Sequence, residues 1–177
     1  MEQTVRQLYN HPCICYWTIF NEGWGQFKSS AMYHLLRKWD DSRFIDSASG
    51  WFAGGETDVD SRHVYFRKMK LKASDKPLVL SEFGGYSFKP EGHVSNTEKT
   101  YGYGRCETRE SLVDALRRLY TEEVHPLIPQ GLCAAVYTQV SDVEDETNGL
   151  LSYDRWVEKV KPEEFVDISS QLYTAIE

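Results

Sequence analysis

The chain has 177 residues, a hydrophobic fraction of 41% and a formal net charge of −7. This length is typical of one folded domain, and the hydrophobic fraction is large enough for a core, which excludes a disordered chain. The negative charge argues against a nucleic-acid-binding protein, and no stretch approaches the ~18 consecutive apolar residues of a membrane-spanning helix.

The first half of the chain alternates between predicted helices and strands. A helix over residues 2–9 ends before Pro12, and the near-continuous apolar run at 13–20 is typical of a strand buried on both faces of a parallel sheet. Apolar residues at helical spacing predict a second helix at 28–39. The other predicted elements of this half are strands at 44–49, 63–66 and 78–81 and a basic, helix-like stretch at 67–70.

A long loop over residues 84–106 opens the second half, and loops of this length in a compact domain are usually functional or mobile. Residues 108–124 have the clearest amphipathic helix pattern. An apolar strand at 133–138, an acidic loop and a helix at 162–176 complete the chain. This order of elements predicts an α/β fold with a parallel sheet and right-handed crossovers.

The cysteines and the amino terminus indicate the cellular compartment of the protein. No pair has the CxxC spacing of a zinc or redox motif, so we expect free, buried thiols in a reducing compartment. The first residues lack the basic and apolar regions of a signal peptide, and we therefore expect a cytoplasmic protein. The four cysteines are Cys13, Cys15, Cys106 and Cys133.

Two of the predicted strands end in a glutamate. The run at 10–22 reads NHPCICYWTIFNE and ends at Glu22, and the run at 76–85 reads KPLVLSEFGG and contains Glu82. In a parallel α/β barrel, catalytic side chains lie at the carboxyl ends of the strands. Two carboxylates in such positions indicate a glycosidase.

The flanking residues carry a resemblance to a known family. Residues 10–22 resemble the acid/base segment of glycoside hydrolase family two, the family of β-galactosidases, β-glucuronidases and β-mannosidases. Residues 77–85 are similar to its nucleophile strand, and residues 137–155 to its last barrel strand and the following loop. The resemblance implies a partial (β/α)₈ TIM barrel, with about strands four to eight and their helices.

A complete barrel typically needs about 250 residues, more than this chain has. The resemblance therefore implies that residues 1–177 are the carboxy-terminal portion of a TIM-barrel glycosidase catalytic domain. The family's β-sandwich domains and first barrel strands have no counterpart in the sequence.

The resemblance also implies roles for three residues. Glu22 is the expected general acid/base and Glu82 the expected nucleophile of a retaining enzyme, whose two carboxyl groups lie roughly 5–5.5 Å apart. Asn21 is expected to hydrogen-bond the sugar 2-hydroxyl. The alternatives are a surface glutamate after a strand for Glu22, a helix-capping glutamate for Glu82 and a turn-forming asparagine for Asn21.

Four further residues are candidates for substrate contacts. Tyr65 is expected to orient the nucleophile and His63 to contact the sugar, with a core tyrosine and a satisfied core histidine as open alternatives. Trp24 and Tyr137 are candidates for stacking on a sugar ring, with plain packing as the alternative.

The sequence also bears on substrate and cofactor. The β-glucuronidase branch carries an Asn-x-Lys motif near its last strand, whereas residues 148–150 read Asn-Gly-Leu. This counts against a uronic acid and favours a neutral β-glycoside, such as a β-galactoside. The acidic loop at 142–146 lacks the spacing of an EF-hand loop and is expected to be a solvated turn. No metal and no cofactor are expected.

Three hypotheses follow. The first is a retaining β-glycosidase whose activity as an isolated piece is left open. Its apolar strands at 13–20 and 133–138 would be sheet edges, which invite self-association or pairing with a missing barrel half. The second is a non-catalytic sugar-binding or structural fragment. The third, a nucleotide-binding α/β domain, is disfavoured because no GxGxxG or P-loop pattern follows a strand.

Overall fold

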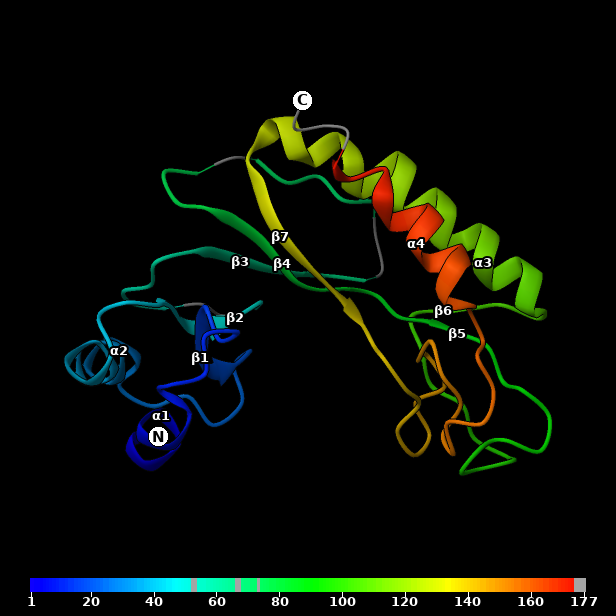
Figure 1. The fold of residues 1–177 in the computed structure, drawn as a ribbon, viewed down its shortest axis with the longest axis horizontal. Coiled ribbons are helices and arrows are strands. Elements are labelled where there is room, and N and C mark those ends of the chain that lie inside the picture. Colours follow the sequence, from blue (N-terminus) through cyan, green and yellow to red (C-terminus); the bar gives the residue numbers. More distant parts are fainter. Residues whose placement is uncertain (52–53, 66–67, 73, 174–177) are drawn as a thin grey trace. The chain divides into compact units, whose positions relative to one another are not determined.

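The computed structural model describes residues 1–51, 54–65, 68–72 and 74–173 (Figure 1). The chain forms two compact units, which are described separately. The first unit comprises residues 1–63 and 73–81, and the second comprises residues 64–72 and 82–177.

The first unit is built around a β-α-β arrangement. Strands β1 and β2 pair in parallel, with Tyr16 opposite Phe44, and α2 is the connection between them. A cluster of Val5, Leu36 and Ile45 is buried between the helices and this strand pair (Figure 1). The elements that begin in this unit are α1 (Glu2–Leu8), β1 (Tyr16–Asn21), α2 (Ser29–Trp39), β2 (Phe44–Ser49), β3 (Asp60–Val64) and β4 (Leu78–Gly84).

The second unit has two helices that lie side by side, α3 and α4 (Figure 1). Thr108 begins α3 with a capping box, in which its hydroxyl accepts a hydrogen bond from the Ser111 N–H. Leu112 and Leu116 of α3 and Ile168 of α4 are buried. The elements of this unit are β5 (Tyr86–Ser87), β6 (Gly104–Arg105), α3 (Arg109–Arg118), a π-helical segment (Leu119–Val124), a 3₁₀ segment (His125–Gln130), β7 (Leu132–Thr138) and α4 (Pro162–Ser170).

The strands form three small sheets. Their orders are β1-β2, β3-β4-β7 and β5-β6, and both two-stranded sheets are parallel. None of these sheets closes into a barrel within the described residues. The predicted α/β class with parallel strands is therefore confirmed, while the numbering of the strands as four to eight stays a prediction.

The prediction of a fully buried strand at 13–20 is wrong in two ways. The strand begins only at Tyr16, and its residues are half-buried or exposed. In β7, likewise, residues 133–136 are exposed. Burial on both faces requires elements packed above and below the strand, and the exposure of β1 shows that it is not covered in this way.

Other boundaries also differ from the predictions. The strand predicted at 63–66 lies at Asp60–Val64, and residue 66 is outside the described residues. The basic stretch forms no helix at residues 68–72, while residue 67 is not described. The helix predicted over 108–124 is α-helical only to Arg118. The final helix ends at Ser170, and residues 174–176 of its predicted range lie outside the described ones.

The cysteines are free thiols, as predicted, but the prediction that they are buried is wrong. Cys13, Cys15 and Cys133 are exposed, and Cys106 is half-buried. An apolar run alone therefore does not establish burial, which depends on the neighbours that the fold supplies. None of the described helices has the length and apolarity needed to cross a bilayer.

Candidate active site

Glu22 directly follows the carboxyl end of β1. The backbone turns there into the left-handed region, with a φ of 53° at Glu22. The Glu22 N–H donates to the carbonyl oxygen of Ser49 over 2.9 Å, and the Ser49 hydroxyl donates to Asn21 Oδ1 over 2.8 Å. The edge of the β1-β2 pair therefore fixes both residues of the Asn-Glu motif.

The Glu22 side chain is held by a buried histidine. Glu22 is 16% exposed, and its Oε1 lies 2.9 Å from Nδ1 of His63, whose side chain is fully buried. The Trp51 indole N–H donates to the His63 carbonyl oxygen over 3.2 Å. Gly50 makes room for the imidazole, since a Cβ there would lie 2.3 Å from His63 Cγ. His63 bonds Glu22 in the structure, and its expected contact with the sugar stays a prediction.

A buried carboxyl, that of Asp46, lies on β2. The Tyr16 hydroxyl donates to Asp46 Oδ2 over 2.6 Å. Burial raises the pKa of Asp46, although its hydrogen bonds oppose this. This pair was not predicted from the sequence. The available signal was an aspartate in the middle of a predicted strand.

In the second unit, Glu82 on β4 accepts a hydrogen bond from the Tyr65 hydroxyl. The Tyr65 oxygen also lies 3.0 Å from Thr138 Oγ1 at the end of β7. Burial and the bond to Glu82 both raise the pKa of Tyr65, which keeps the phenol protonated and able to donate. The predicted contact of Tyr65 with the nucleophile candidate is therefore present in the structure.

Two neighbours of Tyr65 were missed by the sequence analysis. Thr138 is one, and its position at the end of an apolar strand was the available signal. The other is Tyr103, whose ring stacks on that of Tyr65 with 3.6 Å between centroids and 10° between planes. Tyr103 belongs to the long loop that was expected to be functional or mobile.

Tyr137 and Trp24 differ from each other in placement. Tyr137 packs edge-to-face on Phe83 with 5.8 Å between ring centroids, and its hydroxyl is buried. Neighbouring residues along a strand point to opposite faces, so Tyr137 cannot share the orientation of Thr138. Burial strongly raises the pKa of Tyr137, and its placement indicates packing rather than a sugar contact. Trp24 is 84% exposed just after Glu22.

A comparison with known families decides the identity of the fold. A family model described as "Glycosyl hydrolases family 2, TIM barrel domain" matches residues 1–155. The chain belongs to glycoside hydrolase family 2. Among curated proteins, none matches the chain.

Family 2 membership confirms the resemblance of the motifs and makes this a glycoside hydrolase domain. The matched range contains Glu22, Glu82 and all the other predicted site residues. Each unit of the family 2 domain provides one carboxylate that is hydrogen-bonded by a side chain of the same unit: the buried His63 ring contacts Glu22, and the half-buried Tyr65 hydroxyl donates to Glu82.

The acidic loop of this family 2 domain is more than the solvated turn that was predicted. Asp142 and Lys159 are both buried and form an ion pair of 2.7 Å. Lys159 Nζ also donates to the carbonyl oxygens of Phe88 and Thr147, over 2.8 and 2.7 Å. Burial lowers the pKa of Lys159 and raises that of Asp142, while the pairing opposes both shifts. A lysine ammonium thus neutralises the first carboxylate of this loop.

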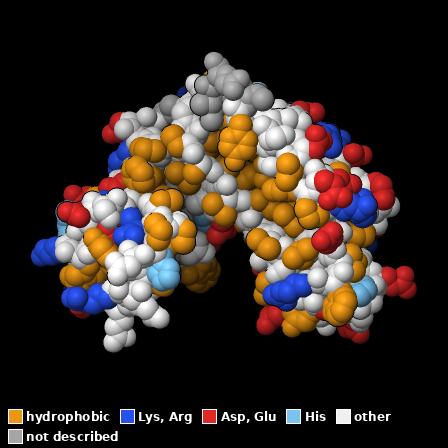
Figure 2. Space-filling view, viewed as in Figure 1, with side chains coloured by type: hydrophobic (Ala, Val, Ile, Leu, Met, Phe, Trp, Pro, Cys, Tyr) orange, Lys and Arg blue, Asp and Glu red, His pale blue; other side chains and the backbone are white. Residues whose placement is uncertain are grey.

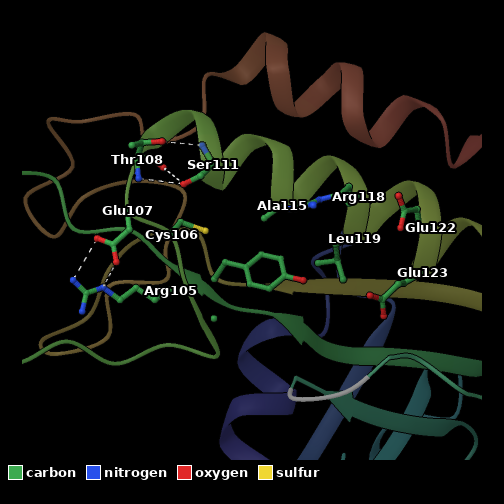
Figure 3. Close-up of a pocket in the computed structure, with 12 residues that line it drawn as sticks. Arg105, Cys106, Glu107, Thr108, Ser111, Ala115, Arg118, Leu119, Glu122 and Glu123 are labelled. Carbon is green, nitrogen blue, oxygen red and sulfur yellow. Dashed lines mark hydrogen bonds and ion pairs between the residues drawn. The ribbon is translucent and has the colours of Figure 1, made fainter.

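A cleft of about 600 Å³ lies beside α3 in the second unit (Figure 3). Its rim carries the exposed ion pair of Arg105 with Glu107, at 3.0 Å, and the capping box of Thr108. The Cys106 thiol faces the same cleft, and burial raises its pKa. None of the predicted site residues of the family 2 domain lines this cleft.

Proposed function

We propose that this domain is the catalytic part of a retaining β-glycosidase, with Glu22 as acid/base and Glu82 as nucleophile. The supporting observation is that each carboxylate lies in a family motif and is hydrogen-bonded by a side chain of its own unit, the buried His63 for Glu22 and the half-buried Tyr65 for Glu82. A glutamate left by chance on a surface turn would not require a buried histidine or a hydrogen-bonding tyrosine beside it.

In the first step, the Glu82 carboxylate attacks the anomeric carbon and the glycosidic C–O bond breaks. The Glu22 carboxyl gives its proton to the departing oxygen, so the products are a glycosyl ester on Glu82 and a free alcohol. In the second step, Glu22 takes a proton from water as the water oxygen attacks the anomeric carbon and releases Glu82. The sugar leaves with its original anomeric configuration.

The remaining site residues have supporting roles in this proposal. The Tyr65 phenol orients Glu82, and His63 holds Glu22. Asn21 lies next to Glu22 and provides a contact for the sugar 2-hydroxyl, and the exposed Trp24 provides a stacking surface. The proposed substrate is a neutral β-glycoside, with a β-galactoside as first choice. The reason is that leucine, at residue 150, replaces the lysine of the Asn-x-Lys motif of the β-glucuronidase branch.

We further propose that residues 1–177 are the carboxy-terminal portion of the barrel, about strands four to eight. The order of the three family motifs along the chain supports this assignment. The partial barrel then pairs with a missing barrel half or with a second copy. The free thiols agree with the cytoplasmic location that we propose for the protein.

The test is hydrolysis of a panel of nitrophenyl β-glycosides by the 177-residue chain. Glu82→Gln is expected to lower kcat by at least about 10³-fold, because the nucleophile is lost. Glu22→Ala is expected to have little effect on cleavage of substrates with a good leaving group, which need no proton from the acid. Added azide is expected to restore turnover in this variant, because azide attacks without a general base. Glu98→Gln, at an exposed site of the second unit, is the control.

Equal activity of Glu82→Gln and the parent chain would contradict the assignment. Binding of a β-galactoside without turnover by the parent chain would instead support a non-catalytic sugar-binding domain.

A further inference from the structure

The long loop after β4 returns to the candidate nucleophile through one aromatic side chain. Tyr103 stacks face to face on Tyr65, at 3.6 Å between centroids, and the Tyr65 hydroxyl donates to Glu82. The loop thus contacts the candidate nucleophile's own hydrogen-bond donor, a residue far away in sequence.

Backbone hydrogen bonds hold Tyr103 in this position. Its N–H donates to the carbonyl oxygen of Gly85 over 2.8 Å, next to the β5-β6 pairing of Tyr86 with Gly104. The neighbouring Tyr101 is fixed by the Thr147 N–H, which donates to its carbonyl oxygen over 3.1 Å. The Tyr101 ring also meets the Tyr103 ring edge-to-face, with 5.4 Å between centroids. The stacked ring is therefore held by its backbone and by a second aromatic ring.

Gly85 makes the stacking sterically possible. Its φ is +71°, and a Cβ at this position would lie 2.6 Å from Cδ2 of Tyr103. Any side chain at residue 85 would have to displace the ring from its place. Gly92, in the same loop, has a similar φ of +76°, but a Cβ there would meet no atom within 4 Å, which gives a matched comparison.

We propose that Tyr103 is a positioning residue for the candidate nucleophile: its ring holds the Tyr65 ring in the orientation from which the phenol donates to Glu82. The importance of Tyr103 for catalysis rests on the proposed function, whereas the coupling between its ring and the Tyr65–Glu82 hydrogen bond does not. Burial raises the pKa of Tyr103, as it does that of Tyr65, so both rings stay neutral while they stack. An anionic ring in this stack would repel the Glu82 carboxylate.

The coupling is tested by NMR of the full chain labelled with ¹³Cζ-tyrosine. The Tyr65 resonance is assigned by its loss in Tyr65→Phe, and Glu82→Gln marks its position when the carboxylate partner is removed. In Tyr103→Ala and Gly85→Ala, the Tyr65 resonance is expected to move toward its Glu82→Gln position. Tyr103→Phe retains the stacked ring and is expected to keep the resonance at its parent position.

Gly92→Ala is the control for a glycine substitution at positive φ, and it is expected to leave the Tyr65 resonance unchanged. A Tyr65 resonance that stays in place in a folded Tyr103→Ala chain would overturn the proposal. A resonance that does not respond to Glu82→Gln would overturn it as well, because the hydrogen bond on which it depends would be absent.

Turnover provides the second readout. Tyr103→Ala is expected to lower kcat by about 10–100-fold with little change in KM, since misplacing a reacting group costs rate rather than binding. Tyr103→Phe is expected to recover most of this loss. If the parent chain has no activity but its Tyr65 resonance responds as described, catalysis by this chain alone fails and the positioning role stands.

Discussion

At the scale of single residues, Asp40 shows how the first unit accommodates a buried charge. Its Oδ2 accepts hydrogen bonds from the Trp17 indole over 2.8 Å and from Arg43 over 2.6 Å. Its Oδ1 accepts from the backbone N–H and the hydroxyl of Ser42. Burial opposes the charge, but these donors outweigh it and hold the pKa of Asp40 well below its usual range.

Asp40→Asn is therefore expected to lower the free energy of unfolding by about 2 kcal/mol at neutral pH. The folded-state pKa is depressed, so the stabilisation is fully present above the ordinary aspartate pKa of about 4. It is lost as the pH falls below that value toward the folded-state pKa. Urea unfolding of both proteins across this range measures the difference. Asp41→Asn, on the exposed neighbour, is expected to show no such dependence.

Single residues also show what the sequence could and could not predict. Glu22 and Glu82 were identified because each lies in a contiguous motif. Tyr103 was missed because its partner Tyr65 is distant in the chain, and their stacking depends on how the long loop returns. The exposure of Cys13 and Cys133 was missed because burial depends on neighbouring strands, about which an apolar run carries no information.

At the scale of elements, the loop after β7 is organised around a buried ion pair. Lys159 joins Asp142, the carbonyl oxygen of Thr147 and that of Phe88 on the preceding long loop. Removing one member of such a pair leaves an uncompensated charge in the interior. Sequence spacing predicted a turn here, but the lysine that neutralises its first carboxylate lies outside the acidic run.

Lys159→Met is expected to lower the free energy of unfolding of the second unit by about 3–5 kcal/mol, because Asp142 is left buried and unpaired. The double variant Lys159→Met/Asp142→Asn is expected to recover part of this loss, since the buried charge is gone. Chemical denaturation measures both. Glu107→Ala breaks an exposed pair and is expected to change stability by under about 1 kcal/mol. A similar effect of the Lys159 and Glu107 variants would refute this account.

At the scale of the whole molecule, the apolar surface left uncovered is the main feature. Hydrophobic side chains lie exposed along the course of β7 (Figure 2), where residues 133–136 are all exposed. The exposed fraction of Val136 is 56%. An apolar strand in this condition is a template for pairing with another chain.

We expect the 177-residue chain to self-associate in a concentration-dependent manner, which sedimentation velocity in the presence of a reductant measures. Val136→Lys is expected to shift the distribution toward the monomer, because a charge on an exposed strand opposes pairing. Val143→Lys, at a site that is 49% exposed outside β7, is the control. A strictly monomeric parent chain would count against the expectation.

The division of the chain between its two units has a consequence for its synthesis. The chain passes from one unit to the other after residues 63, 72 and 81. Neither unit is a continuous segment, so the first cannot be finished on the ribosome until Ser81 has emerged, by which time the start of the second has already been made. Most of the second unit is still to be made at that point, but its residues 64–72 already lie between the two segments of the first, so no single cut of the polypeptide would yield either unit whole.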